Sequence, residues 1–256
     1  DMPASKAVYY GIFHSISAFN NAGFSLFSDS LIKYRGDWLV NLVIAALIIS
    51  GGIGFIVISD LFNYFKGKLV RISLHTKIVL SATAILITAG TLFIFIFEYS
   101  NPNTFIGMPL NEKFLAAFFA SVTTRTAGFN TIDYSDLRLE TLFLSIILMF
   151  IGASPGGTGG GIKTTTFALV IASLCTMVRG ARDTVMFRRR IPLETVSKSF
   201  LIATLAALFV VIISLMIIRY EDTKYLSTVF EITSAFGTVG LSVGDGGSRS
   251  LTALFT

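Results

Sequence analysis

Apolar residues along the chain form long and short runs, separated by loops that carry most of the charge. A helix needs about 20 residues to cross a bilayer core of about 30 Å. Three runs meet this length: residues 38–61, 78–97 and 200–218. Three others are too short to cross: residues 6–19, 114–123 and 229–235. We therefore predict three spanning helices and three short helices that enter the membrane without crossing it.

A fourth apolar stretch, residues 139–178, is too long for one straight span, because about 40 helical residues would measure about 60 Å. Its middle reads Gly152-Ala153-Ser154-Pro155-Gly156-Gly157-Thr158-Gly159-Gly160-Gly161-Ile162-Lys163. So much glycine next to a proline is costly in a helix. We predict two helical parts, 139–152 and 164–178, joined by an irregular loop at membrane depth. The segment Gly51-Gly52-Ile53-Gly54 would let its helix bend or approach a neighbour closely.

Composition supports an integral membrane protein. Hydrophobic residues make up 53% of the 256 residues and charged residues 14%, against roughly 25% charged in soluble domains. Mean hydropathy is +0.75. The single cysteine, Cys175, excludes a disulfide within this chain. The net charge of +5 is spread over loops beside apolar runs, without zinc-finger spacing, so no nucleic-acid partner is expected.

The basic residues predict the orientation. Two linkers, 66–77 and 179–198, hold half of the 20 lysines and arginines: Lys66, Lys68, Arg71, Lys77, Arg179, Arg182, Arg188, Arg189, Arg190 and Lys198. Most acidic residues lie in the other loops. Since cytoplasmic loops carry the excess of Lys and Arg, both linkers should be cytoplasmic. The loops that follow the three short helices then all face outward.

Each short helix leads into small residues and one glycine. Gly23, Gly128 and Gly240 align, 105 and 112 residues apart, and we predict a filter lined by backbone carbonyls, which can replace the water shell of a monovalent cation. The carboxyl ends of the short helices would point partial negative charge at it. The predicted ion-binding residues are Asn20, Asn21, Ala22, Gly23, Thr124, Arg125, Thr126, Ala127, Gly128, Phe236, Gly237, Thr238, Val239 and Gly240. The alternative is that the glycines serve only in turns or helix packing.

Three filter residues have side chains that invite a specific role. A guanidinium aimed into the pore would repel cations, so we expect Arg125 to point away from it, toward carbonyls or an outer-loop acid. Asn20 and Asn21 would either brace the first filter segment or lie at the surface of a turn.

The glycine-rich loop is predicted to be a gate beneath the filter, formed by Gly156, Gly157, Thr158, Gly159, Gly160, Gly161 and Lys163. Irregular backbone at this depth is tolerated inside protein or beside water. Lys163 would hold the loop, face the cavity or extend to the interface. The alternative is a nucleotide-binding membrane pump or enzyme that uses residues 156–164, but Ile162 interrupts the phosphate-loop pattern before Lys163-Thr164. A non-conducting structural partner is a third possibility.

Enzymatic chemistry is not expected. His14 and His75 lie apart without metal-ligand spacing, and the sequence shows no nucleophile triad, paired carboxylates or cysteine cluster.

These motifs together resemble the Ktr/Trk family of potassium uptake proteins, and most of all the membrane pore subunit of Ktr systems. The resemblance covers essentially the whole chain and rests on four stretches: residues 13–25, 126–130, 234–241 and 156–163. It implies an all-α membrane fold of helix–pore-loop–helix units arranged pseudo-four-fold around a central pore. Potassium would be coordinated around Gly23, Gly128 and Gly240, and loop 152–163 would be the gate.

The resemblance also implies four repeats in one polypeptide. Residues 1–65 would be the second repeat without its outer helix, and 78–178 the complete third repeat. Residues 199–256 would be the start of the fourth, with 66–77 and 179–198 as cytoplasmic linkers. We therefore expect this chain to be part of a longer protein, or its ordered part, and not to conduct alone.

The implied partners are a second copy of the protein, a cytoplasmic ring of nucleotide-binding regulatory subunits and the lipid bilayer. Nucleotide would bind on the ring. Sodium would activate transport, and one glycine per filter segment implies looser discrimination against sodium than in tetrameric potassium channels. The resemblance points to a multi-pass protein of a bacterial cell membrane.

Overall fold

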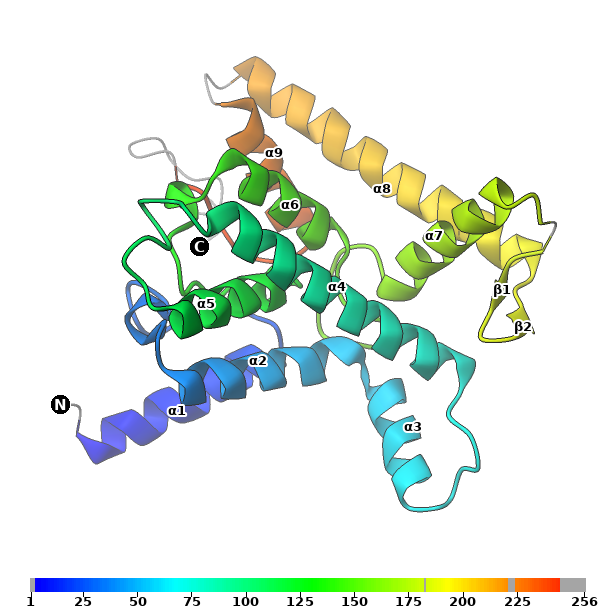
Figure 1. Ribbon diagram of the computed structural model, residues 1–256, viewed down its shortest axis with the longest axis horizontal. Helices are drawn as coiled ribbons and strands as arrows, with labels where there is room; N and C mark the ends of the chain where they lie inside the picture. The colour runs from blue at the N-terminus through cyan, green and yellow to red at the C-terminus, as the bar shows by residue number, and fades with distance from the viewer. Residues whose placement is uncertain (1–2, 182, 221–223, 245–256) are drawn as a thin grey trace.

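The computed structural model describes residues 3–181, 183–220 and 224–244, and in these ranges the chain is mainly helical (Figure 1). Arg182, in the second predicted linker, and residues 245–256, in the last predicted repeat, lie outside the described residues. The helices are α1 (Ala4–Phe19), α2 (Trp38–Ile53), α3 (Phe55–Phe65), α4 (Leu74–Glu98), α5 (Leu110–Thr123), α6 (Leu139–Phe150), α7 (Thr164–Val178), α8 (Leu193–Tyr220) and α9 (Tyr225–Phe236). A two-stranded hairpin, β1 (Val185–Met186) and β2 (Arg189–Arg190), was not expected.

The three short helices are α1, α5 and α9, and each extends a few residues beyond its predicted start. Among the described residues, α4 and α8 are each long and apolar enough to cross a membrane. The split of 139–178 is confirmed, since α6 and α7 are separate apolar helices with an irregular segment between them.

The span predicted over 38–61 is not one straight helix: it breaks at Gly54, and the two halves, α2 and α3, are bent by 98°. Gly54 has φ +88°, which favours glycine, and a Cβ there would lie 2.6 Å from the Pro155 carbonyl oxygen. The break frees backbone groups for the glycine-rich loop: Ser154 N–H donates to the Gly52 carbonyl (2.9 Å). Composition alone could not separate a bend from a straight packed helix.

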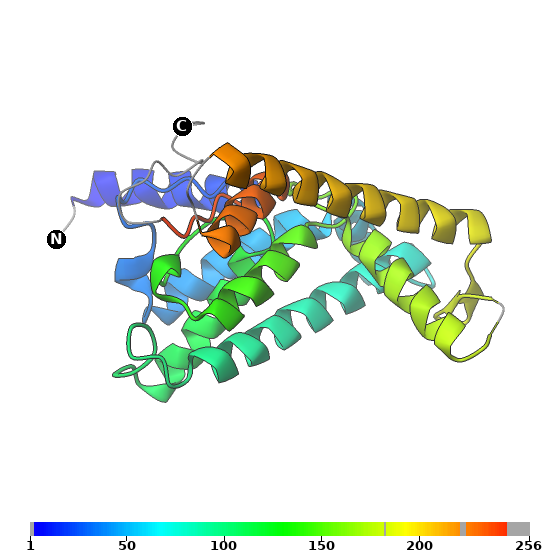
Figure 2. The same ribbon diagram turned by 90° about the horizontal axis from the view of Figure 1, so that it is seen from above.

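Helix packing brings the repeats around one centre. α4 packs on α5, α6 on α9, α1 on α2, and α8 lies against α7 and α9. Figure 2 shows the long helices α4 and α8 on opposite sides of the molecule. A buried core that includes Ile94, Phe105, Phe230 and Leu241 joins the middle unit to the last one. The filter segments are therefore held by helices from neighbouring units.

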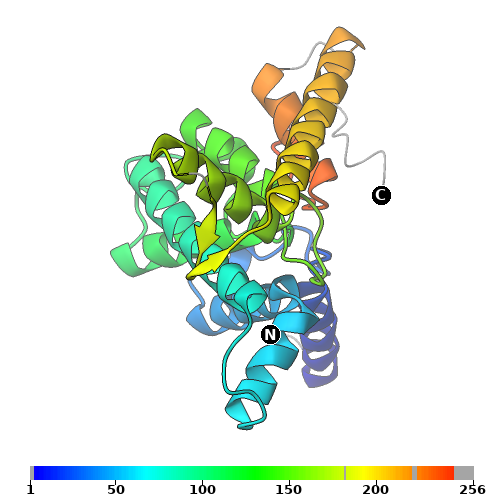
Figure 3. The same ribbon diagram turned by 90° about the vertical axis from the view of Figure 1, so that its right-hand side faces the viewer.

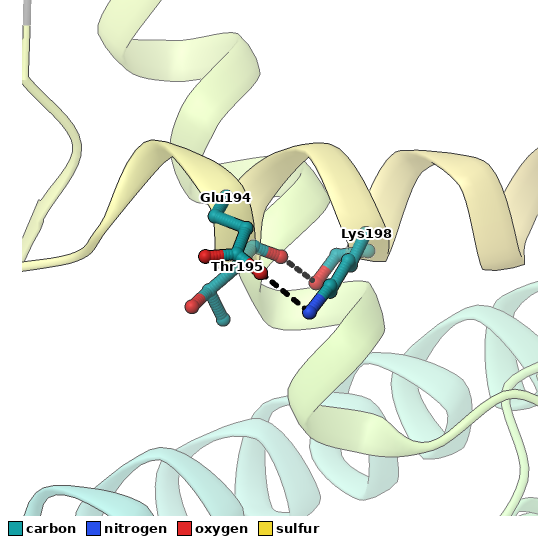
Figure 4. Close-up of polar contacts among 4 residues, drawn as sticks. Glu194, Thr195 and Lys198 are labelled. Carbon is teal, nitrogen blue, oxygen red and sulfur yellow. Dashed lines mark hydrogen bonds and ion pairs between the residues drawn. The ribbon is translucent and has the colours of Figure 1, made fainter.

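Both basic linkers lie at one end of the molecule, at the right of Figure 1, and Figure 3 views the molecule from that end. There the exposed Glu194 and Lys198 form an ion pair (2.6 Å) in the first turns of α8, beside the Ser199 hydroxyl bonded to the Thr195 carbonyl (Figure 4). The loop after α4 lies at the opposite end. This arrangement agrees with the sidedness predicted from the charges.

At that opposite end, the fully buried Glu98 ties the loop after α4 to the start of α6. Its carboxylate accepts hydrogen bonds from Asn101 Nδ2 (2.6 Å), Thr104 Oγ1 (2.6 Å) and Arg138 N (3.0 Å), and from the Thr141 hydroxyl. A buried carboxylate is stable only when its oxygens are satisfied in this way. The cluster fixes the segment that follows the second short helix.

Candidate functional site

The three aligned glycines meet in space. A Cβ built on Gly23 would lie 2.5 Å from the Ala127 carbonyl oxygen and 3.1 Å from Gly128 Cα. A Cβ on Gly128 would lie 2.2 Å from the Val239 carbonyl oxygen. Gly23 and Gly128 thus each face the carbonyl just before the next glycine, so the three segments follow one another head to tail, while a Cβ on Gly240 would meet no described atom within 4 Å. The three segments therefore lie together, which is not expected of glycines that serve in helix packing at unrelated places.

The backbone conformation is the same in all three segments. φ is positive at the glycines (+74°, +79° and +84°) and also two residues earlier, at Asn21 (+51°), Thr126 (+69°) and Thr238 (+53°). The residue between has negative φ in each case. Alternation of the sign of φ turns successive peptide groups to the same side, which lines up backbone dipoles on one face of each segment.

A hydroxyl near the end of each short helix holds the carbonyl that follows the filter glycine. Ser17 Oγ donates to Phe24 O (2.9 Å), Thr123 Oγ1 to Phe129 O (2.7 Å) and Ser234 Oγ to Leu241 O (2.7 Å). All three hydroxyl residues are buried. The sequence pattern did not single them out, because Thr123 is displaced by one position relative to the two serines.

Of the predicted ion-binding residues, the structure brings together 21–23, 126–128 and 238–240. The others belong to the ends of the short helices. Thr124 is the C-terminal cap of α5, and Phe236 stacks on Phe150 of α6 (5.8 Å between ring centroids). Asn20 is exposed and bonds to Ile16 O within its own helix, and Gly237 N–H closes the last turn of α9.

Asn21 and Arg125 connect neighbouring parts of the site. Asn21 is buried, and its amide donates to Arg125 O (3.2 Å) and Thr126 Oγ1 (3.3 Å), so it braces the second segment rather than its own. The Arg125 guanidinium donates to the Thr83 carbonyl of α4 (3.5 Å), as expected for a side chain directed away from the axis. In the described parts of the chain it forms no ion pair with an outer-loop acid.

The glycine-rich loop packs directly against the inner ends of the filter segments. Thr158 Oγ1 donates to Phe19 O (3.3 Å), and Gly160 N–H donates to Thr238 Oγ1 (3.0 Å). A Cβ on Gly159 would lie 1.8 Å from Thr126 Oγ1. Lys163 is half-buried and its ammonium donates to Gly159 O (2.8 Å), so it holds the loop. One loop therefore contacts all three segments.

Most of the backbone N–H groups of loop 152–164 already have protein acceptors. Gly152 N donates to Ile162 O (2.9 Å), Ala153 N to Gly160 O (3.1 Å) and Thr158 N to Gly51 O (3.2 Å). A phosphate-binding loop needs several free N–H groups that converge on the anion. The hydrogen bonding observed here favours a structural plug over a nucleotide site.

Comparison with known proteins gives consistent results. Residues 3–256 match the family described as "TrkH: Cation transport protein". The Ktr system potassium uptake protein B of Bacillus subtilis is 44% identical over 241 residues, which are 94% of this chain and 54% of that protein. The potassium/sodium uptake protein NtpJ of Enterococcus hirae is 37% identical over 247 residues, 94% of this chain and 53% of that protein.

The crystal structure of the potassium transporter TrkH from Vibrio parahaemolyticus has the same fold, with a TM-score of 0.73 at 20% identity over 96% of this chain and 55% of that one. This chain thus spans about half the length of the relatives it matches. Both the sequence match and the fold lead to one assignment: the chain belongs to the TrkH family of cation transport proteins.

Proposed function

We propose that this chain supplies three filter segments and the gate of a potassium uptake protein. The observation that carries the proposal is the head-to-tail meeting of the three glycine segments, in which Gly23 and Gly128 are each placed against a carbonyl of the next segment. The ion is the transported substrate, and the relatives named for potassium uptake support potassium as that ion.

The chemistry follows from the backbone. A potassium ion loses its hydration water only where oxygens replace it, and carbonyls do so without a full charge that would trap the ion. The segments 20–23, 124–128 and 236–240 would provide these oxygens. The carboxyl ends of α1, α5 and α9 add partial negative charge at the same place. Sodium would be the second ion, since one relative is named for potassium and sodium uptake.

The proposed assembly has four pore repeats around one axis, in the plasma membrane of a bacterium. Residues 1–65, 78–178 and 199–256 would belong to three of these repeats, with loop 152–163 as the gate. The proposed partners are a second copy of the protein and a cytoplasmic ring of nucleotide-binding regulatory subunits, which would dock at the end that carries linkers 66–77 and 179–198. Charge at that end supports the docking side.

Uptake of potassium by the full-length protein tests the proposal. Bacterial cells that lack their own potassium uptake systems should grow at low external potassium when they express it, and should accumulate rubidium as a tracer. A full-length protein that reaches the membrane but restores neither growth nor rubidium uptake would support the non-conducting structural partner instead.

The bracing hydroxyls should matter for selectivity. Ser234→Ala removes the bond to Leu241 O, and a hydrogen bond of this kind contributes about 0.5–1.5 kcal/mol. We expect the potassium-to-sodium uptake ratio to fall about two- to tenfold, because the filter carbonyl behind Gly240 loses its support. Ser214→Ala is the matched control: this buried serine of α8 bonds to Val210 O (2.7 Å) within its own helix, and the ratio should not change.

A further inference from the structure

Two side chains at the same position of different repeats make the same hydrogen bonds. His14 lies nine residues before Gly23, and Glu231 lies nine residues before Gly240. Both are buried in short helices, with 6% and 8% of their surface exposed. Neither belongs to the filter motifs, and a histidine and a glutamate are not recognisable as equivalents in the sequence.

Each side chain binds the segment just after its filter glycine. His14 Nε2 contacts Ser25 Oγ (3.0 Å) and accepts from Leu26 N–H (3.3 Å). Glu231 Oε1 accepts from Ser242 Oγ (2.6 Å) and Val243 N–H (2.9 Å). Even the third bond is repeated, since Ser25 Oγ accepts from Phe27 N–H (3.0 Å) and Ser242 Oγ from Gly244 N–H (3.3 Å).

The middle repeat is built differently. The corresponding residue is Phe119, which is fully buried and cannot accept a hydrogen bond. There the outer part of the segment is held from outside, by Asn130 N–H bonded to Ser30 Oγ (3.0 Å) and Leu31 N–H bonded to Asn130 O (2.8 Å). Among the described residues, no hydrogen bond from another repeat reaches residues 25–27 or 242–244, so the acceptor on the short helix carries weight there.

The bonds of His14 define its proton state. Leu26 N–H can only donate, so Nε2 must accept and carries no proton. Nδ1 lies 2.7 Å from the Tyr10 carbonyl, which can only accept, so Nδ1 carries the proton. A second proton on Nε2 would face the Leu26 N–H and remove that bond, and the Ser25 hydroxyl could then only accept from the ring.

We propose that His14 and Glu231 are equivalent positioning residues for the first and third filter segments. His14 stops holding the first segment when an external proton binds Nε2, because the bond from Leu26 N–H is then lost. This inference rests on the proposed function. Around His14 lies a cavity of about 450 Å³, and Tyr10 and Tyr34 are the other titratable residues that line it. Lys6, about two turns before His14 on α1, lies over the Tyr10 ring (5.4 Å). The second filter segment faces His14 with Phe129.

The test compares rubidium uptake by the full-length protein at external pH 7.5 and 5.5. Wild-type uptake should fall at least about threefold, over the range in which histidine gains a proton. His14→Gln places an amide oxygen near Nε2, an acceptor that stays unprotonated, so uptake should stay level. His14→Leu removes the acceptor and should lower uptake at both pH values. His75→Gln, at the other end of the molecule, should keep the wild-type pH profile.

A wild-type protein with level uptake, a His14→Gln variant with the wild-type decline, or a His14→Leu variant with full uptake at pH 7.5 would each overturn the inference. Absence of uptake by the wild type even at pH 7.5 would instead refute the proposed function. The ¹⁵N NMR spectrum of histidine-labelled, purified protein tests the inference separately. The signal missing from His14→Gln should show the Nδ1–H tautomer at pH 7.5, and an Nε2–H tautomer there would overturn it.

Discussion

Gly128→Ala in the full-length protein should abolish potassium uptake, to less than about 1% of the wild-type rate. The added Cβ would lie 2.2 Å from the Val239 carbonyl oxygen, well inside van der Waals contact. Gly128 also has φ +79°, a conformation that costs a residue with a side chain about 1–2 kcal/mol. Relief of the clash and of the backbone strain would move the Val239 and Ala127 carbonyls away from the position in which they face the ion. A loss of about 3 kcal/mol in ion stabilisation at the filter corresponds to more than a hundredfold in rate.

The matched control is Gly67→Ala. Gly67 has a similar φ of +70°, but a Cβ there would meet no atom within 4 Å. The variant carries the backbone strain without the clash and lies in the basic linker 66–77. We expect nearly normal rubidium uptake and normal membrane expression. Equal losses in both variants would mean that general destabilisation, and not displacement of the filter carbonyls, explains the Gly128 result.

Deletion of Thr158-Gly159-Gly160 should raise potassium flux through the full-length protein about tenfold or more. These residues make the two hydrogen bonds that fasten the loop to the filter, from Thr158 Oγ1 to Phe19 O and from Gly160 N–H to Thr238 Oγ1. At about 0.5–1.5 kcal/mol each, their loss favours the open arrangement by about 1–3 kcal/mol, or roughly 5–150-fold in population. Rubidium flux into proteoliposomes of the purified protein, without regulatory subunits, measures the effect.

A deletion of equal length elsewhere controls for damage to the fold. Removal of Gly67-Lys68-Leu69, in the exposed linker between α3 and α4, takes away none of the contacts with the filter and should leave flux unchanged. If the loop deletion gives a protein of normal thermal stability whose flux is equal to or below that of the wild type, the loop is not a gate.

Much of the architecture follows from the amino-acid sequence. Run lengths separated the short helices from the spans because the bilayer sets a length that a helix must reach. The glycine-rich interruption placed the break between α6 and α7 within a few residues, since helix breaking by glycine and proline is a local property. The three glycine positions were also readable, because positive φ at a fixed place in a repeat leaves glycine at that place.

Contacts between repeats were decided by the tertiary structure. Gly54 bends its helix by 98° because the glycine-rich loop, about 100 residues later, binds the freed carbonyls. Asn21 supports the second filter segment, and His14 and Glu231 hold corresponding segments with different chemistry. Such partners depend on which backbone groups packing brings within hydrogen-bond distance. Sequence spacing determines conformation along the chain, whereas the position of one repeat against the next arises only when their surfaces pack together.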